Sequence, residues 1–129
     1  MYCEEGNLVG YDERDLTRDV YRIGDYAVAT GIAVPYALAA RSQLGLGSAD
    51  PDALRSAVCL AGWFSAAVFD REVPGVQASP GDLDESVLFL LVYGVEDDVL
   101  GAADLSAFQL VDLFRAGFVE GVSACDVGT

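Results

Sequence analysis

The side chains of this chain that could do chemistry are carboxylates, cysteines, tyrosines and arginines, because the sequence contains no histidine and no lysine. The absence of histidine excludes His-based zinc sites, Ser-His and Cys-His nucleophile pairs, and acid–base catalysis by imidazole. The absence of lysine excludes Schiff bases, Ser-Lys dyads and the lysine of a phosphate-binding P-loop. An enzyme that works with carboxylates alone has no motif behind it in this sequence.

Carboxylates gather at two places in the sequence, "DLDE" at Asp82–Glu85 and "EDD" at Glu96–Asp98. Neither has the D-x-D-x-D-G spacing of a calcium-binding EF-hand loop. We therefore predict that the first is a solvated helix start, with Asp82 at a helix N-terminus where negative charge is favourable, and that the second is a loop. No metal ion and no other cofactor is expected.

Hydrophobic periodicity and capping signals predict a mainly α domain that spans residues 1–129. Asp25 is a suitable N-cap for the apolar run Tyr26–Ala40, and Gly45 is a suitable stop. That helix is apolar nearly all round, which is typical of a helix at the centre of a domain. Pro35 lies in its interior and predicts a kink near Gly31.

The remaining elements are predicted around this central apolar helix. Residues 2–11 form a short extended segment, since Leu8 and Val9 lie between turn-forming residues. The predicted helices, about five in all, span approximately residues 12–24, 25–45, 51–69, 82–94 and 104–119.

Charge and hydropathy restrict the class of partner. Twenty-one acidic residues against seven arginines give a net charge of -14, which repels nucleic acid and anionic lipid surfaces. The runs Tyr26–Ala40 and Val87–Val95 are shorter than the roughly 20 residues that span a bilayer, so no direct membrane insertion is expected. The acidic N-terminus does not resemble a signal peptide, so the chain is either cytoplasmic or the mature part or a fragment of a longer protein.

Four blocks of the sequence together resemble the putative neutral zinc metallopeptidase family, a zincin-type group whose core helix carries H-E-x-x-H. The blocks occur in family order and cover nearly all of the chain. They are "YCEEGNLVGYD" at 2–12, "GDYAVATGIAVPYALAARSQLG" at 24–45, "ALRSAVCLAGWF" at 53–64, and "SPGDLDESV" with "FQLVDLFRAGFVEGVSAC" at 79–87 and 108–125.

The departures from the family pattern matter most. In an ungapped alignment the two zinc histidines fall on Val34 and Leu38, the catalytic glutamate on Pro35, and the third zinc ligand on Leu54. A catalytic zinc needs three protein ligands and a base for its bound water, and these four residues supply none of them. The resemblance therefore implies a pseudoenzyme in which Val34, Leu38 and Leu54 refill the metal cavity with apolar volume.

The resemblance also bears on the cysteines and the aromatic residues. Cys3, Cys59 and Cys125 coincide with family cysteine positions; a redox or metal site lacks a C-x-x-C spacing, and the favoured interpretation is a Cys59–Cys125 disulfide. Cys3 is then free or pairs with something upstream. Tyr26, Tyr36 and Trp63 are either core residues or the lining of a vestigial cleft; a cleft would require a concavity beside the degenerate positions.

Two functional hypotheses follow from the resemblance. The first is a catalytically inactive metallopeptidase-like domain that acts as a structural or protein-interaction module, with a protein partner or self-association, in a secreted or cell-envelope setting. The second is a binding module that holds an apolar ligand or peptide in the vestigial cleft without cleaving it. The family domain has a preceding segment that supplies sheet strands, so we expect an excised domain or a truncated paralogue.

Overall fold

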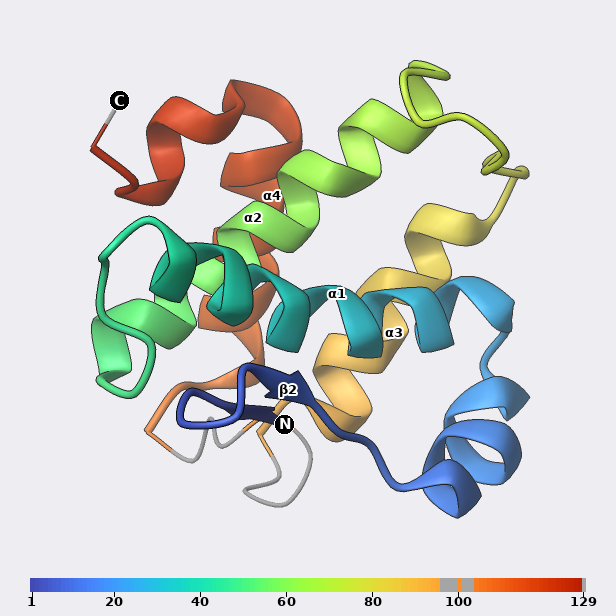
Figure 1. The fold of residues 1–129 in the computed structure, drawn as a ribbon. Helices are drawn as coiled ribbons and strands as arrows, with labels where there is room; N and C mark the ends of the chain where they lie inside the picture. The colour runs from blue at the N-terminus through green and yellow to red at the C-terminus, as the bar shows by residue number, and fades with distance from the viewer. Residues whose placement is uncertain (96–99, 101–103, 129) are drawn as a thin grey trace.

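The computed structural model describes residues 1–95, 100 and 104–128 and shows a mainly helical fold (Figure 1). A two-stranded antiparallel hairpin of β1 (Tyr2–Cys3) and β2 (Leu8–Val9) forms the N-terminus. Two short turns follow, the π-helical η1 (Asp15–Asp19) and the 3-10 helical η2 (Val20–Arg22). The predictions of a mainly α fold and of a short extended N-terminal segment are thus confirmed.

Four α-helices and a final 3-10 turn make up the rest of the described chain. They are α1 (Asp25–Gln43), α2 (Pro51–Phe69), α3 (Asp82–Tyr93), α4 (Ala107–Glu120) and η3 (Val122–Cys125). α2 begins at the Asp50 cap, whose side chain accepts the Ala53 N–H at 2.9 Å. α4 begins three residues later than predicted, because Ser106 and Gln109 form a reciprocal capping box there. The predicted "EDD" loop lies outside the described residues.

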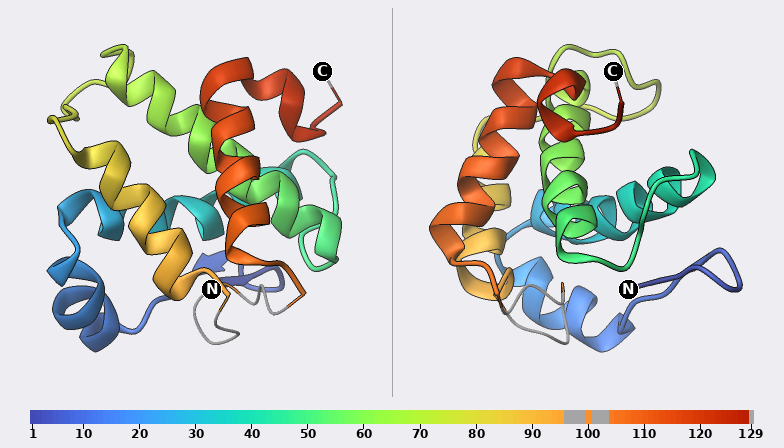
Figure 2. Two further views of the ribbon diagram at one scale, coloured as in Figure 1. Left: turned by 180° about the vertical axis from the view of Figure 1, so that it is seen from behind. Right: turned by 90° about the vertical axis from the view of Figure 1, so that its left-hand side faces the viewer.

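The core lies where α2, α3 and α4 meet one stripe of α1. Its largest fully buried side chains include Phe89 and Leu90 from α3 and Leu110 and Phe114 from α4. α4 packs against α2 and crosses it in the left view of Figure 2. α2 is the one described helix that is long and apolar enough to cross a membrane, and 56% of its apolar window is buried inside this core.

α1 packs against α2, α3 and the hairpin, and it continues unbroken through Pro35. Its burial differs from that of a helix enclosed on all sides. Ala27, Thr30 and Val34 form a buried stripe toward the core, whereas Tyr36 is 60% exposed. The reason is that two pockets flank α1, one on each side of the buried stripe.

Candidate functional site

A groove of about 650 Å³ lies between α1 and α2 and is bordered by the segment that leads into α3. α1 contributes Tyr26 and Tyr36, α2 contributes Trp63 and Phe64, and the bordering segment contributes Val76. Figure 1 shows α2 rising away from α1 toward that segment. We call this feature the α1–α2 groove. It contains all three aromatic residues that the sequence analysis singled out.

The sequence of α1 explains why a groove forms here. Ala29, Ala33, Ala37 and Ala40 all line the groove, and their spacing of three to four residues places them on one face of the helix. Short side chains in this row leave the space that longer ones would fill. On the facing helix, Trp63 is 44% exposed, so its ring is available to a ligand.

Three carboxylates lie at the end of the groove near the N-termini of α1 and α3. Oxygen atoms of Asp25, Asp82 and Glu85 lie within 4.8 Å of one another. Asp25 and Asp82 line the groove, and Asp25 is exposed. Such clusters are common at helix starts, and two of these carboxylates have structural partners.

Glu85 Oε2 accepts the backbone N–H of Tyr26 at 2.8 Å, so a residue of α3 caps the N-terminus of α1. The prediction that Asp25 is the N-cap is therefore wrong: Asp25 is the first helical residue, and Gly24 precedes the helix without a side-chain bond. Gly24 is needed because a side chain there would occupy the space of the Glu85 carboxylate. The sequence carries no local signal for a cap that comes from 59 residues away.

Asp82 is also not the solvated residue that the sequence analysis predicted. It is 6% exposed, and its Oδ2 accepts the Ser79 N–H at 2.6 Å. The carboxylate therefore holds the turn before α3 while it lines the groove. The positive end of the α3 dipole stabilises its charge.

Tyr26 contributes a polar group without a partner at the acidic end of the groove. The residue is 6% exposed, and among the described residues its hydroxyl makes no hydrogen bond. Burial raises the pKa of Tyr26, the neighbouring Ser65 hydroxyl opposes the shift, and the charge of Asp82 adds to it. Ser65 Oγ itself donates to Ala61 O at 3.0 Å.

The four residues at the implied zinc-site positions do not fit a metal. Val34 is 1% exposed and belongs to the core, and Leu38 and Leu54 are partly buried against that core. None of these three lines the α1–α2 groove, so the concavity expected beside them is not this one. Pro35 is buried and lines a second pocket, of about 540 Å³, with Gly31 and the N-terminal segment.

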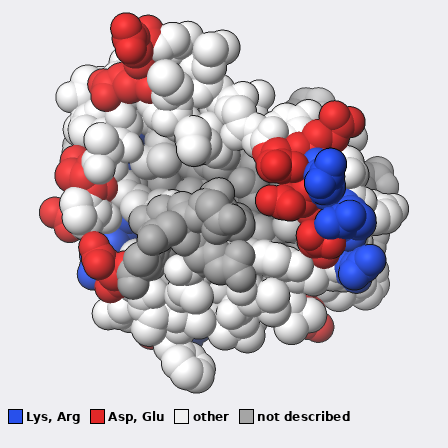
Figure 3. Space-filling view, turned by 90° about the horizontal axis from the view of Figure 1, so that it is seen from below, with Lys and Arg blue, Asp and Glu red and all other residues white. Residues whose placement is uncertain are grey.

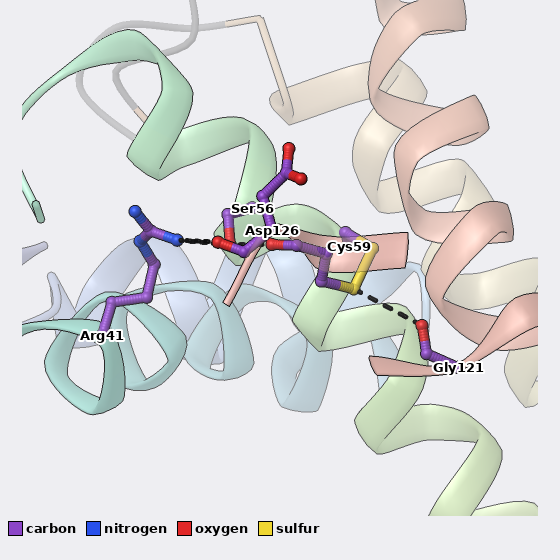
Figure 4. Close-up of a disulfide and its surroundings, with 6 residues drawn as sticks. Arg41, Ser56, Cys59, Gly121 and Asp126 are labelled. Atoms are coloured by element: carbon purple, nitrogen blue, oxygen red, sulfur yellow. Dashed lines mark hydrogen bonds between the residues drawn. A yellow bond between two sulfur atoms is a disulfide. The ribbon is translucent and has the colours of Figure 1, made fainter. Parts of the chain in front are cut away.

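Cys59 and Cys125 form a disulfide that ties η3 to α2, with Cα atoms 5.3 Å apart (Figure 4). This is the pair that the sequence analysis favoured, and Cys3 is free and exposed. Beside the disulfide, buried Arg41 donates from Nη1 to Ser56 Oγ at 2.7 Å. Ser56 Oγ in turn donates to Cys125 O, so the C-terminal turn is held both covalently and by hydrogen bonds.

Charged side chains on the face seen in Figure 3 lie mostly toward its edge, and basic side chains there stand among acidic ones. In residues 1–95, 100 and 104–128, the ion pair that forms is Arg18–Asp19, at 3.3 Å. No arginine lines the α1–α2 groove or pairs with Asp25, Asp82 or Glu85 within this part of the chain. The acidic end of the groove thus has no basic counter-charge of its own.

Comparison with models of protein families, with curated proteins and with solved structures finds no match to this chain.

Proposed function

We propose that this protein is a non-catalytic binding domain that holds a peptide segment of a protein partner in the α1–α2 groove. The observation that carries the proposal is the meeting of Tyr26, Tyr36 and Trp63 in one groove. Aromatic side chains supply large contact areas at small entropic cost, and they are enriched where proteins bind one another. The groove volume falls within the range of ligand sites, about 300–1,000 Å³.

Absence of catalysis is part of this proposal and rests on the sequence. Val34, Pro35, Leu38 and Leu54 stand where the metallopeptidase resemblance puts a zinc site, and none can bind zinc or act as a base. The same resemblance, together with the disulfide, favours a secreted or cell-envelope setting, because disulfides persist in oxidising compartments. One zinc ion per purified chain, with peptidase activity, would contradict this part of the proposal.

A selection from a library of random peptides tests the binding function. Peptides selected on the intact protein are measured against Tyr36→Ser, which changes an exposed residue of the groove and should leave the fold intact. Phe108→Ser is the matched control, because Phe108 is 80% exposed and does not line the groove. We expect Tyr36→Ser alone to weaken binding. Equal affinity for both variants would place the binding site elsewhere and overturn the proposal.

A further inference from the structure

We propose that the peptide held in the α1–α2 groove is basic and amphipathic, with its Arg or Lys side chain over Asp25 and Asp82 and its apolar side chains between Tyr36 and Trp63. This inference rests on the proposed function and specifies the chemistry of the partner. It follows from the charge and the shape of the groove and from the carboxylate acceptors that line its acidic end.

The charge at the acidic end exceeds what the two helix N-termini neutralise. Asp25, Asp82 and Glu85 together carry three negative charges when ionised. The N-termini of α1 and α3 each contribute roughly half a positive charge, so about two negative charges remain. A cationic side chain that binds there replaces a missing counter-charge, and a neutral one does not.

The overall charge of the protein acts in the same direction. A net charge of -14 attracts basic segments from a distance and repels acidic ones, which raises the association rate for a basic partner. The arginines of the protein do not compete for this end of the groove, since none lines it in the part of the chain that the structure describes.

The shape of the groove favours a peptide over a compact small molecule. Its α1 wall runs from Asp25 to Ala40, which corresponds to about 22 Å along the helix axis. That length accommodates about four turns of a bound amphipathic helix, which is a common way for a peptide to occupy an apolar groove. The carboxylates lie at one end of this wall and Tyr36 in its other half, so the groove also sets the direction of the peptide.

The two carboxylates that line the acidic end suit a guanidinium group. Oxygen atoms of Asp25 and Asp82 lie within 4.8 Å of one another, and both residues line the groove. A guanidinium group presents five N–H donors in a planar fork, so one arginine side chain can donate to both carboxylates.

The test compares two peptides that differ only in charge. Both have leucines at helical i, i+3/i+4 and i+7 spacing and capped termini; one has two arginines at one end, and the other has the uncharged isostere citrulline at the same positions. The protein has one tryptophan, Trp63, and it lies in the groove, so its fluorescence reports occupancy directly. A chelator in the buffer keeps divalent cations from the carboxylates.

We expect the arginine peptide to bind about tenfold more tightly than the citrulline peptide at moderate salt, and the difference to shrink as salt rises. Asp25→Asn should weaken the binding of the arginine peptide about three- to fivefold and leave the affinity for the citrulline peptide unchanged. Asp52→Asn is the matched control: Asp52 is also an exposed acid in the first turn of a helix, but it does not line the groove.

The outcomes separate this inference from the proposed function. If both peptides bind equally and Tyr36→Ser weakens the binding of both, the groove remains a binding site, but the inference that its partner is basic is overturned. If neither peptide shifts Trp63 fluorescence and Tyr36→Ser abolishes a concentration-dependent dimer in sedimentation, the occupant is a second copy of this chain, and both proposals fall. Equal effects of Asp25→Asn and Asp52→Asn would show that only the net charge matters, and would also overturn the assigned site.

Discussion

Gly62 of α2 and Gly117 of α4 face each other where the two helices cross, and each lies against the backbone of the other helix. A Cβ atom added at Gly62 would overlap the carbonyl of Phe114, and one added at Gly117 would overlap the carbonyl of Cys59. The relationship is reciprocal: Gly62 meets Phe114, three residues before Gly117, and Gly117 meets Cys59, three residues before Gly62. Both glycines are buried, so the close approach of α2 and α4 depends on them.

Gly117→Ala should destabilise the fold although alanine is the better helix former. The alanine methyl group would gain up to about 1 kcal/mol in helix propensity, but it would force two backbones apart and disturb the packing around Phe114. We expect a net loss of about 2 kcal/mol or more in the free energy of unfolding, measured by urea denaturation. Gly10→Ala is the control: in the part of the chain that the structure describes, no atom lies within 4 Å of a Cβ added there, so a comparable loss would contradict the crossing as the cause.

Removal of the Cys59–Cys125 disulfide should lower stability substantially. The two cysteines are 66 residues apart, and the entropy of closing such a loop in the unfolded chain corresponds to about 4 kcal/mol as an upper estimate. The double variant Cys59→Ala with Cys125→Ala should therefore unfold at clearly lower urea concentration. Cys3→Ala, which changes the free and exposed cysteine, should match the parent. If the double variant is as stable as the parent, the hydrogen bonds of Ser56 and Arg41 hold η3 in place without the disulfide.

Local signals in the sequence predicted most elements of the fold and none of the contacts between distant segments. Asp50 and Pro51 correctly predicted the start of α2, because both residues act on the helix that they begin. Asp25 was expected to act in the same way, but Glu85 caps α1 from another helix. The Gly62–Gly117 crossing was missed for the same reason, since each glycine alone is an unremarkable residue within a helix.

The groove, too, was only partly predictable from the sequence. Tyr26, Tyr36 and Trp63 could be selected from the sequence as candidate lining, and they do line one groove. Its place could not be predicted, because it depends on how α2 rises away from α1. The row that includes Ala33 and Ala37 was the available signal: small residues on an otherwise apolar face indicate either a close helix contact or a hollow. Only the arrangement of neighbouring elements decides between these two.

Arg41 is expected to stabilise the C-terminal turn through hydrogen bonds and not through an ion pair. It is 7% exposed, and it donates to Gly47 O at 2.9 Å, to Ser56 Oγ at 2.7 Å and to Asp126 O at 3.3 Å. Arg41→Met leaves the buried Ser56 Oγ and the partly buried carbonyls of Gly47 and Asp126 without this donor, which should lower the free energy of unfolding by about 2–4 kcal/mol.

Arg41→Lys tests the geometry of the same contact. Lysine keeps the charge, but its single ammonium group does not reproduce the planar fork that reaches several acceptors, so we expect only partial recovery in urea unfolding. Arg115→Met is the control, because Arg115 is exposed on α4, and its change should stay within about 0.5 kcal/mol. Full recovery by lysine would show that the charge is what matters.

Tyr26→Phe should leave stability at neutral pH unchanged or slightly raised, because it removes a buried hydroxyl that lacks a hydrogen-bond partner among the described residues. Its effect at alkaline pH is a separate consequence of the raised pKa. The folded protein holds the Tyr26 proton more tightly than the unfolded chain does, so the resulting stability is fully present below the ordinary tyrosine pKa of 10.0. It is lost as the pH rises through the folded-state pKa.

Urea unfolding between neutral pH and about pH 11 measures this contribution, since the window must extend above the ordinary tyrosine pKa. The parent should lose stability over the alkaline part of the range, and Tyr26→Phe should lose less. Tyr21→Phe is the matched control, because Tyr21 is 60% exposed and should leave the alkaline slope unchanged. If Tyr26→Phe lowers stability at neutral pH by as much as a lost hydrogen bond, about 1 kcal/mol, the hydroxyl has a partner after all, and the expectation of a neutral or stabilising change is wrong.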